Sequence, residues 1–303
     1  MAHVPHPSRS AAPAGFDPAL VDAVLADALG TAALETAARR PAALGPDDLR
    51  PGARVYGISG LQGTGKSTLA AQLAVAARGR GLAVATLSLD DVYLDRPERE
   101  ALAREVHPLL LTRGPPGTHD LPLALATLDA LRTGVPTALP RFDKLADRRC
   151  PRTAWPQVGP VDLVILEGWC LGAPAEADAA LATPLNALER DEDPDGRWRR
   201  RCNEALAHDY PALWSCVDRL LFLQPPGFDI VPTWRWEQER ALQAAEPDRR
   251  AMDRAGIARF VQHYERVSRQ ALRTLPDRAH AVIALDAQRQ PIGGMRLRQP
   301  GAR

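Results

Sequence analysis

The stretch Val55-Tyr56-Gly57-Ile58-Ser59-Gly60-Leu61-Gln62-Gly63-Thr64-Gly65-Lys66-Ser67 joins a short apolar run to a phosphate-binding motif. Its second half fits G-x-x-x-x-G-K-[ST], in which the glycines let several backbone N–H groups point at one phosphate. Lys66 supplies charge for the outer phosphates and Ser67 a hydroxyl for Mg²⁺; a glycine-rich helix entry without ligand is the alternative. We predict that ATP is bound by Gly60, Leu61, Gln62, Gly63, Thr64, Gly65, Lys66, Ser67 and Thr68.

Further apolar runs alternate with helix-forming segments along the chain. The runs predict strands at 55–59, 83–89, 161–166, 219–223 and 281–286. None of them alternates cleanly between apolar and polar residues, which is typical of strands covered on both faces. Helices are predicted at 67–80, 121–133 and 198–206, followed by a long polar helical region at 234–273. The pattern favours an α/β fold of the P-loop NTPase type, with a doubly wound parallel sheet flanked by helices.

Composition divides the chain into segments. Residues 1–15 are rich in Pro, Ala and Ser and predict a disordered tail, and 16–48 predict an N-terminal helical extension with apolar residues at helical spacing. The P-loop domain is expected at 49–290, including a helical lid, and a C-terminal tail at 291–303.

The bulk composition excludes several classes of protein. A formal charge of +1 over 303 residues gives no basic field for nucleic acid, so a small anionic ligand is expected instead. The four cysteines have no metal-ligand spacing, which predicts reduced thiols in a cytoplasmic protein. No apolar stretch is long enough for a membrane helix, so no membrane partner is expected.

Lysine is rare in this chain. Of the 38 basic residues, only Lys66 and Lys144 are Lys and the rest are Arg. A Lys that persists against such a background suggests a position that needs a compact ammonium. Lys144, in the run Pro140-Arg141-Phe142-Asp143-Lys144, is therefore a site candidate, although chance is the alternative.

Acidic residues follow two of the predicted strands. Asp90 and Asp91 come after the second strand, and Glu167 ends the third in a Walker-B-like run. Phosphoryl transfer uses a carboxylate that orients the acceptor hydroxyl and takes its proton, together with Mg²⁺. We expect Asp90 in that role, with Lys66 and Glu167 also catalytic, and Asp91 as a cap or turn residue. The expected metal ligands are Ser67, Asp90 and Glu167.

Cationic residues cluster between these strands. Lys66 and Mg²⁺ already serve the phosphates of ATP, so the further cations suggest an anionic acceptor such as a carboxylate. The alternative is that some of them pair with Asp143 and Asp147. Arg235, near the start of the lid, is expected to reach the nucleotide. The expected acceptor site consists of Asp90, Tyr93, Arg113, His119, Arg141, Lys144 and Arg148.

Taken in order, these motifs resemble the D-glycerate 3-kinases, within the broader P-loop group of uridine kinase, phosphoribulokinase and pantothenate kinase. The resemblance spans about residues 50–290 and rests on the runs GLQGTGKST, SLDDVY, HPLL, RGPPGTHD, PRFDK, ILEGWC and FVQHYERV. It implies transfer of the γ-phosphate of Mg-ATP to a hydroxyl of D-glycerate to give 3-phosphoglycerate, with the acid at Asp90 as base. The chain has Val92 where the family usually has an aromatic residue. The spacing after Lys144 varies among relatives, so the resemblance supports Arg148 less strongly.

Three alternatives remain open or are excluded at this point. A kinase for a nucleoside or a pantothenate-like alcohol would need an aromatic slot or an apolar channel, and the chain is only 5% aromatic. A non-catalytic ATP-binding regulatory protein would not need Asp90 and the acceptor-side cations. A GTP switch is excluded because the chain has no N-K-x-D motif. The phosphorylated carbon and the oligomeric state do not follow from the sequence.

Overall fold

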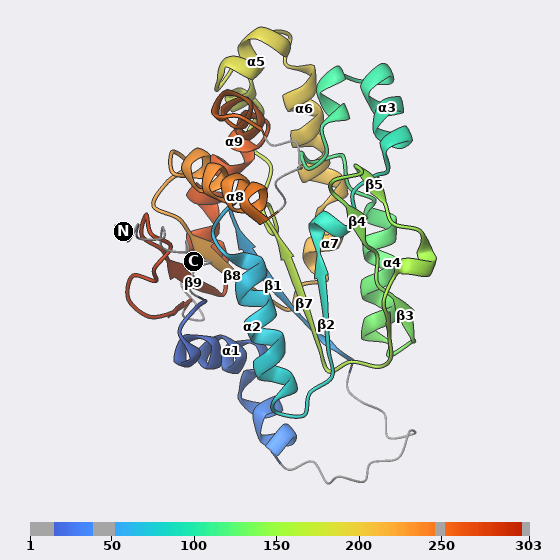
Figure 1. The fold of residues 1–303 in the computed structure, drawn as a ribbon, viewed down its shortest axis with the longest axis vertical. Helices are drawn as coiled ribbons and strands as arrows, with labels where there is room; N and C mark the ends of the chain where they lie inside the picture. The colour runs from blue at the N-terminus through green and yellow to red at the C-terminus, as the bar shows by residue number, and fades with distance from the viewer. Residues whose placement is uncertain (1–14, 39–51, 246–251, 299–303) are drawn as a thin grey trace, which may run out of the picture.

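The central sheet of the protein is the feature that positions everything else (Figure 1). The computed structural model describes residues 15–38, 52–245 and 252–298. In this part of the chain the main sheet has six strands in the order β10-β9-β8-β1-β7-β2, parallel except for β10. The predicted P-loop α/β fold is therefore confirmed. The strands are β1 (Arg54–Gly60), β2 (Val84–Ser88), β7 (Leu163–Gly168), β8 (Arg219–Gln224), β9 (Ala281–Ala284) and β10 (Arg296–Leu297).

Strand β1 lies at the middle of the sheet. It pairs with β7 on one side, with Ser59 opposite Gly168, and with β8 on the other. Its last six residues are all buried, which explains why its sequence is apolar without alternation. The five predicted strands are each confirmed to within three residues at either end. Because parallel strands end at one edge, the residues after β1, β2 and β7 lie together there.

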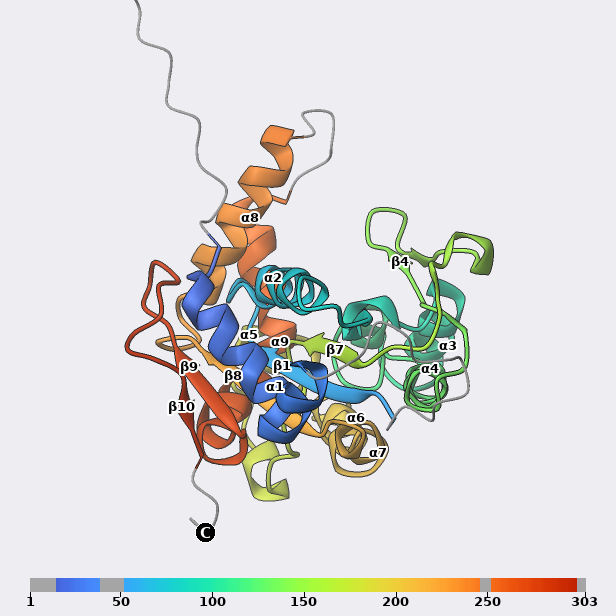
Figure 2. The same cartoon turned by 90° about the horizontal axis from the view of Figure 1, so that it is seen from below.

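Helices cover both faces of the sheet. On one face, α1 and α2 pack with Tyr56, Ile58 and Ile165 in one apolar core. On the other face, α4, α7 and α9 enclose a second core around Val55 and Phe222. Figure 2 shows the two layers of helices on either side of the strands. Burial on both faces accounts for the stability of a sheet with so few polar strand positions.

The three shorter predicted helices, at 67–80, 121–133 and 198–206, match α2, α4 and α6 to within two residues at either end. Asp120 caps the start of α4, where its carboxylate accepts a hydrogen bond from the amide of Leu123 (3.0 Å). No helix in the described ranges is both long enough and apolar enough to cross a membrane. The helices are α1 (Pro18–Ala38), α2 (Lys66–Arg78), α3 (Arg96–Glu105), α4 (Leu121–Arg132), α5 (Ala187–Glu192), α6 (Arg197–Glu204), α7 (Pro211–Ser215), α8 (Val231–Ala245) and α9 (Arg254–Arg278).

Several predictions differ from the structure. The predicted C-terminal tail from residue 291 contains β10, which pairs with β9 through backbone hydrogen bonds that need no apolar pattern. The long polar region consists of two helices, α8 and α9, and α3 was not predicted although Asp95 and Glu98 form a capping box. The helical extension contains α1, with a non-helical φ of 69° at Gly30. Residues 1–14 of the predicted tail, 39–48 of the extension and 299–303 lie outside the described residues.

Two short hairpins complete the fold beside the sheet. One pairs β3 (Thr137–Ala138) with β6 (Gln157–Val158), and the other pairs β4 (Phe142–Asp143) with β5 (Arg148–Arg149). The turn of the second hairpin, called here the Lys144 hairpin, contains Asp147 with a left-handed φ of 52°. It brings Lys144 back toward the end of β2, which places it at the predicted site.

Candidate active site

The loop between β1 and α2 has a backbone that only glycine adopts readily at two positions. Gly63 and Gly65 have φ values of 86° and 88°. The buried hydroxyl of Thr64 donates to the carbonyl of Leu61 (2.8 Å) and closes the loop. Helix α2 begins directly at Lys66, so the loop leads into the positive end of a helix. This is an arrangement suited to binding phosphate.

The phosphate loop is supported by the C-terminal part of the chain. A Cβ at position 63 would lie 2.6 Å from Cβ of Trp234, so no larger residue fits there. Trp234 is fully buried at the start of α8 and donates its indole N–H to the carbonyl of Ala287 (2.9 Å). Nε of Arg289 donates to the carbonyl of Gly63 (2.9 Å), and the guanidinium lies 5.0 Å from the Trp234 ring centre. The loop is therefore held between α8 and the segment after β9.

A hydroxyl and a carboxylate lie side by side near the ends of β1 and β7. The hydroxyl of Ser67 donates to Oε1 of Glu167 (3.0 Å). Carboxylate and hydroxyl oxygens are ligands that Mg²⁺ prefers, so this pair fits a magnesium ion. Burial lowers the pKa of Lys66, and the nearby carboxylates of Glu167 and Asp90 oppose that effect. Of the predicted metal ligands, the structure brings Ser67 and Glu167 into contact.

Asp90 is the carboxylate on which the charges of the site converge. Its Oδ1 accepts from the hydroxyl of Tyr93 and its Oδ2 from the ammonium of Lys144, both at 2.5 Å. Burial raises the pKa of Asp90, but the charge and hydrogen bond of Lys144, the hydrogen bond from Tyr93 and the charge of Lys66 together lower it to about 2. Asp90 is thus ionised at neutral pH. Lys144, which the rarity of Lys in this chain had made a candidate, is hydrogen-bonded to it.

Asp91 has a different role from Asp90. Its carboxylate accepts from the backbone of Ser88 and closes a capping box at the turn after β2. Arg141 reaches the same carboxylate at 3.4 Å and also donates to the carbonyl of Pro140 (2.7 Å). The expectation that Asp91 is a cap is confirmed, and Arg141 lies beside this cap rather than on Asp90.

Arg113 contacts the Lys144 hairpin. It donates to Asp147 (2.5 Å) and to the carbonyl of Lys144 (3.0 Å), and its guanidinium lies 5.7 Å from the ring centre of Phe142. Asp147 also accepts from Arg99 (2.8 Å), which is 1% exposed. The structure thus bears out the alternative in which one predicted substrate cation pairs with Asp147. Arg113 holds the hairpin that carries Lys144, whatever else it binds.

The ring of His119 packs against the ring of Tyr93. The two residues form an isolated bridge between backbone segments, and their ring centres are 5.1 Å apart. Burial lowers the pKa of His119 to about 4 in spite of the nearby Asp90 carboxylate, so the imidazole is neutral near pH 7. Its Nδ1 lies 2.5 Å from the hydroxyl of Tyr210, a fully buried residue.

Two predicted residues lie apart from this cluster of contacts. Arg148 is exposed on β5. Its charge adds to the hydrogen bond from the Ala146 amide in lowering the pKa of Asp143. Arg235, on α8, pairs with the buried Glu239 (3.3 Å) and packs over Phe260. In this structure Arg235 is thus held between α8 and α9. A contact with nucleotide would require its side chain to turn away from Glu239.

Sequence reasoning missed two residues that shape the site, Tyr210 and Arg149, and named a third, Asp147, only as an alternative partner for the cations. Tyr210 binds both His119 and the amide of Gly117. Arg149 donates to Asp120 (2.7 Å) and to the carbonyl of Tyr93 (3.1 Å), which holds Tyr93 against the start of α4. Asp147 forms ion pairs with Arg99 and Arg113. Tyr210 and Arg149 belong to no motif, so no sequence signal marked them.

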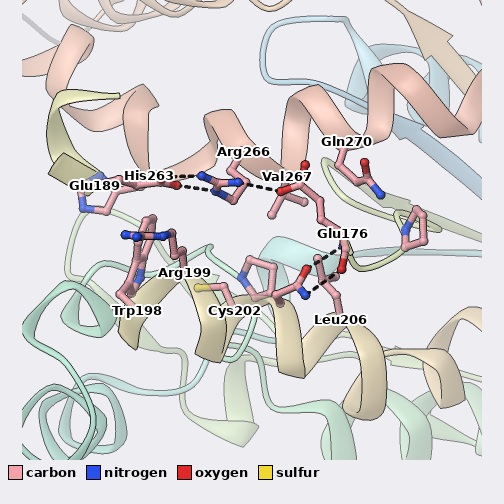
Figure 3. A pocket seen from close by; sticks show the side chains of 13 residues that line it. Glu176, Glu189, Trp198, Arg199, Cys202, Leu206, His263, Arg266, Val267 and Gln270 are labelled. Carbon is pink, nitrogen blue, oxygen red and sulfur yellow. Dashed lines mark hydrogen bonds and ion pairs between the residues drawn. The ribbon is translucent and has the colours of Figure 1, made fainter. Parts of the chain in front are cut away.

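A cavity lies outside this site, between α6 and α9 (Figure 3). Arg266 crosses one wall and pairs with Glu189 (2.7 Å) and Glu176 (2.9 Å). Pro116, three residues before His119, lines the cavity. No residue of the phosphate loop lines it. The charges in the wall neutralise one another, so the cavity offers no free cation for a phosphate among the residues that line it. We therefore do not place ATP there.

Comparisons with known proteins show similarity to kinases. No model of a known protein family matches the chain. The chain is 31% identical over 255 residues to a Schizosaccharomyces pombe protein named uncharacterized kinase mug58, a match that covers 78% of this chain and 90% of the relative. It is also 31% identical over 270 residues to the chloroplastic D-glycerate 3-kinase of Arabidopsis thaliana. That match covers 81% of this chain but only 55% of the longer plant protein.

A solved structure is similar over nearly the whole chain. D-glycerate 3-kinase from Cryptococcus neoformans has a TM-score of 0.71 to this protein and is 26% identical in sequence. The superposition covers 92% of this chain and 99% of the fungal one. The similarity therefore extends over most of the fold.

Proposed function

Because the chain belongs to the P-loop kinase family that contains the D-glycerate 3-kinases, we propose that it phosphorylates D-glycerate with ATP to give 3-phosphoglycerate and ADP. One observation carries the proposal beyond the family. The carboxylate of Asp90, held by Tyr93 and Lys144, lies at the end of β2 within the electrostatic reach of Lys66. A phosphate lysine and an ionised carboxylate in one site suit transfer of a phosphoryl group to an alcohol.

Asp90 is proposed to orient the acceptor hydroxyl and receive its proton. The hydroxyl oxygen forms a bond to the γ-phosphorus while the bond from that phosphorus to the bridging oxygen of ADP breaks, and the proton passes to Asp90. A pKa of about 2 makes Asp90 a weak base. A weak base suffices because the transition state of phosphoryl transfer is loose and needs mainly positioning and charge neutralisation.

Magnesium is proposed to bind at Ser67 and Glu167. When bound, it would neutralise charge on the transferring phosphoryl group. Asp90, also predicted as a ligand, uses both carboxylate oxygens for Tyr93 and Lys144. We therefore assign the ion first to the oxygens of Ser67 and Glu167 and leave the remaining lone pairs of Asp90 to the acceptor hydroxyl.

The acceptor carboxylate is proposed to bind to cations at the rim of the site. Lys144, Arg141 and Arg113 have side chains that are 55%, 31% and 29% exposed. Ion pairs at such positions contribute only about 0 to 1 kcal/mol, so a substrate carboxylate can replace one of the protein carboxylates at little cost. This accounts for cations that are paired in this structure and still serve an anionic substrate.

The location and the partners stay predictions. We propose a cytoplasmic enzyme that acts on a small anionic substrate without nucleic acid or membrane. The plant relative, by contrast, is named as chloroplastic.

An ADP-release assay with Mg-ATP tests the proposal. The acceptors are D-glycerate, L-glycerate, glycerol, uridine and pantothenate, and NMR identifies the phosphorylated carbon of any product. Selective turnover of D-glycerate at carbon 3 supports the proposal. Selective turnover of uridine or pantothenate would replace the acceptor, and ATP binding without turnover of any of the five would favour the regulatory alternative.

A variant of Asp90 tests its role within the same assay. Asp90→Asn keeps the size of the side chain and should lower kcat by a factor on the order of 10² to 10⁴, the usual contribution of a general base, while KM for ATP changes little. Asp143→Asn is the matched control, because Asp143 binds only the backbone amides of Leu145 and Ala146. Near-normal kcat in Asp90→Asn would remove Asp90 from the proposed mechanism.

A further inference from the structure

Buried His119 has one ring nitrogen without a partner. The residue is only 5% exposed, and its Nδ1 is engaged by the hydroxyl of Tyr210 at 2.5 Å. Its Nε2 is buried and makes no hydrogen bond to any described residue. Buried polar atoms are rarely left without a partner, because the lost hydration costs free energy. The unpaired Nε2 therefore indicates a partner that this structure does not contain.

The contacts of Tyr210 decide which nitrogen carries the proton. The Tyr210 oxygen accepts a hydrogen bond from the amide of Gly117 (3.1 Å), and its own proton then needs an acceptor. His119 Nδ1 is the acceptor within reach, which leaves the proton of the imidazole on Nε2. In the opposite arrangement, with the proton on Nδ1, both the Tyr210 O–H and the Nε2 lone pair would be buried without a partner. The first arrangement leaves only the Nε2–H donor unpaired.

This donor lies close to the proposed chemistry. The ring of Tyr93, whose hydroxyl binds Asp90, is 5.1 Å from the His119 ring between their centres. Burial lowers the pKa of His119, and the negative charge of Asp90 opposes that effect, so the two side chains lie within electrostatic reach of each other. Since the imidazole is neutral near pH 7, its N–H matches a neutral oxygen better than a carboxylate, for which the arginines and Lys144 are available.

We propose that the Nε2–H of His119 donates to the hydroxyl of the acceptor that is not phosphorylated, the C2 hydroxyl in D-glycerate, and so determines specificity. Tyr210 is a positioning residue that holds His119 in this tautomer. The inference rests on the proposed function. It deepens it by naming the group that distinguishes a 2,3-dihydroxy acid from a simple 3-hydroxy acid.

Kinetics with two substrates test the donor. D-glycerate and 3-hydroxypropionate differ only in the C2 hydroxyl. In His119→Ala, kcat/KM for D-glycerate should fall about tenfold or more, mainly through KM, because a binding hydrogen bond is lost. The value for 3-hydroxypropionate should change far less, so that the preference for D-glycerate shrinks. His119→Gln, which keeps an N–H near the position of Nε2, should restore part of the preference.

The control for these variants is His263→Gln. His263 is a similarly buried histidine, with a pKa also lowered to about 4 by burial, but it lines the separate cavity between α6 and α9. It should leave the substrate preference unchanged. An equal loss for both substrates in His119→Ala, with no rescue by Gln, would overturn the assignment to the C2 hydroxyl.

NMR tests the role of Tyr210 without relying on turnover. In ¹⁵N-histidine-labelled protein, the couplings between ring protons and nitrogens should identify His119 as the Nε2–H tautomer, and D-glycerate should shift that nitrogen signal. Tyr210→Phe should give a mixed or reversed tautomer and raise KM for D-glycerate severalfold with kcat nearly retained. Tyr56→Phe, which removes the buried hydroxyl that binds Asp27 on α1, is the matched control and should change neither.

The possible failures are distinguishable. If the wild-type enzyme does not phosphorylate D-glycerate, the proposed function fails, while the tautomer is still read from the spectrum. If D-glycerate is turned over but His119 is the Nδ1–H tautomer, or its nitrogen signal does not respond to the substrate, the further inference fails alone.

Discussion

At the residue level, the acid–base properties of the site depend on the contact between Lys144 and Asp90. The ammonium is the largest influence that lowers the pKa of this carboxyl, and burial opposes it. Lys144→Met should therefore raise the pKa of Asp90 and shift the acid limb of the kcat/KM profile for D-glycerate to higher pH. In the wild-type enzyme, Asp90 should cause no loss of activity until the pH falls well below 4.

Lys144→Arg is the control for this shift. It keeps the positive charge, so the acid limb should stay where it is even if KM changes with the shape of the head group. If Lys144→Met raised KM but left the acid limb unmoved, Lys144 would act on the substrate alone. The profile is measured as kcat/KM between pH 4 and 9 at saturating Mg-ATP.

Two glycines offer a second comparison at this level. Gly63→Ala should reduce kcat/KM for ATP on the order of a hundredfold, because it strains the left-handed backbone and also presses a methyl group on Trp234. Gly81→Ala is matched to it in φ (77°) but meets no atom within 4 Å. It should cost about 1 kcal/mol of stability and leave the kinetics unchanged. Equal kinetics in both variants would show that the contact with Trp234 does not support the loop.

Among the elements, the Lys144 hairpin carries the contact described above, and arginines from two other segments hold it. Asp147→Asn suits the left-handed backbone of residue 147 but removes the charge that binds Arg99 and Arg113. We expect a loss of about 1 to 3 kcal/mol in urea unfolding, because nearly buried Arg99 loses its counter-charge. KM for D-glycerate should rise as well, since the hairpin positions Lys144.

Asp143→Asn lies on the same hairpin and is the control for this variant. It keeps an oxygen for the two backbone amides that it binds, so stability should change by less than about 0.5 kcal/mol. If Asp147→Asn lowered stability but left KM unchanged, the hairpin would be a structural support only.

Individual strands and loops show how much of the fold and of the site could be predicted from the sequence. Strands such as 219–223 could be predicted because buried parallel strands are apolar throughout, and Lys66, Asp90 and Glu167 because chemistry gathers at strand ends. The position of β10 could not, since Arg296 and Leu297 are exposed and are held through backbone pairing. Tyr210 could not either, because its importance depends on a contact with a residue 91 positions away.

For the whole molecule, α1 joins the N-terminal extension to the sheet. Asp27 on α1 accepts hydrogen bonds from the buried hydroxyl of Tyr56 (2.9 Å) and from Arg219 (2.5 Å), on two adjacent strands. Asp27→Ala leaves both donors without their partner and should lower the free energy of unfolding by about 2 to 4 kcal/mol. The kinetic constants at 25 °C should not change, because none of these residues touches the site.

Urea unfolding followed by circular dichroism measures this loss. Asp22→Ala on the same helix is the control, since its ion pair with Arg80 is exposed and should contribute at most about 1 kcal/mol. An unchanged unfolding midpoint in Asp27→Ala would mean that α1 rests on the sheet without stabilising it. Changed kinetic constants would instead connect the extension to the phosphate loop.

The central position of β1 also has a consequence for how the chain matures on the ribosome. Both neighbours of β1 come later in the chain, β7 ending at Gly168 and β8 at Gln224, and Arg289 supports the phosphate loop from still further along. During synthesis, both edges of β1 therefore stay unpaired and its apolar faces uncovered, a state prone to aggregation. If the phosphate loop binds nucleotide as proposed, nucleotide cannot stabilise the loop fully until Arg289 has been synthesised. The interval before release is thus when this enzyme depends most on chaperones.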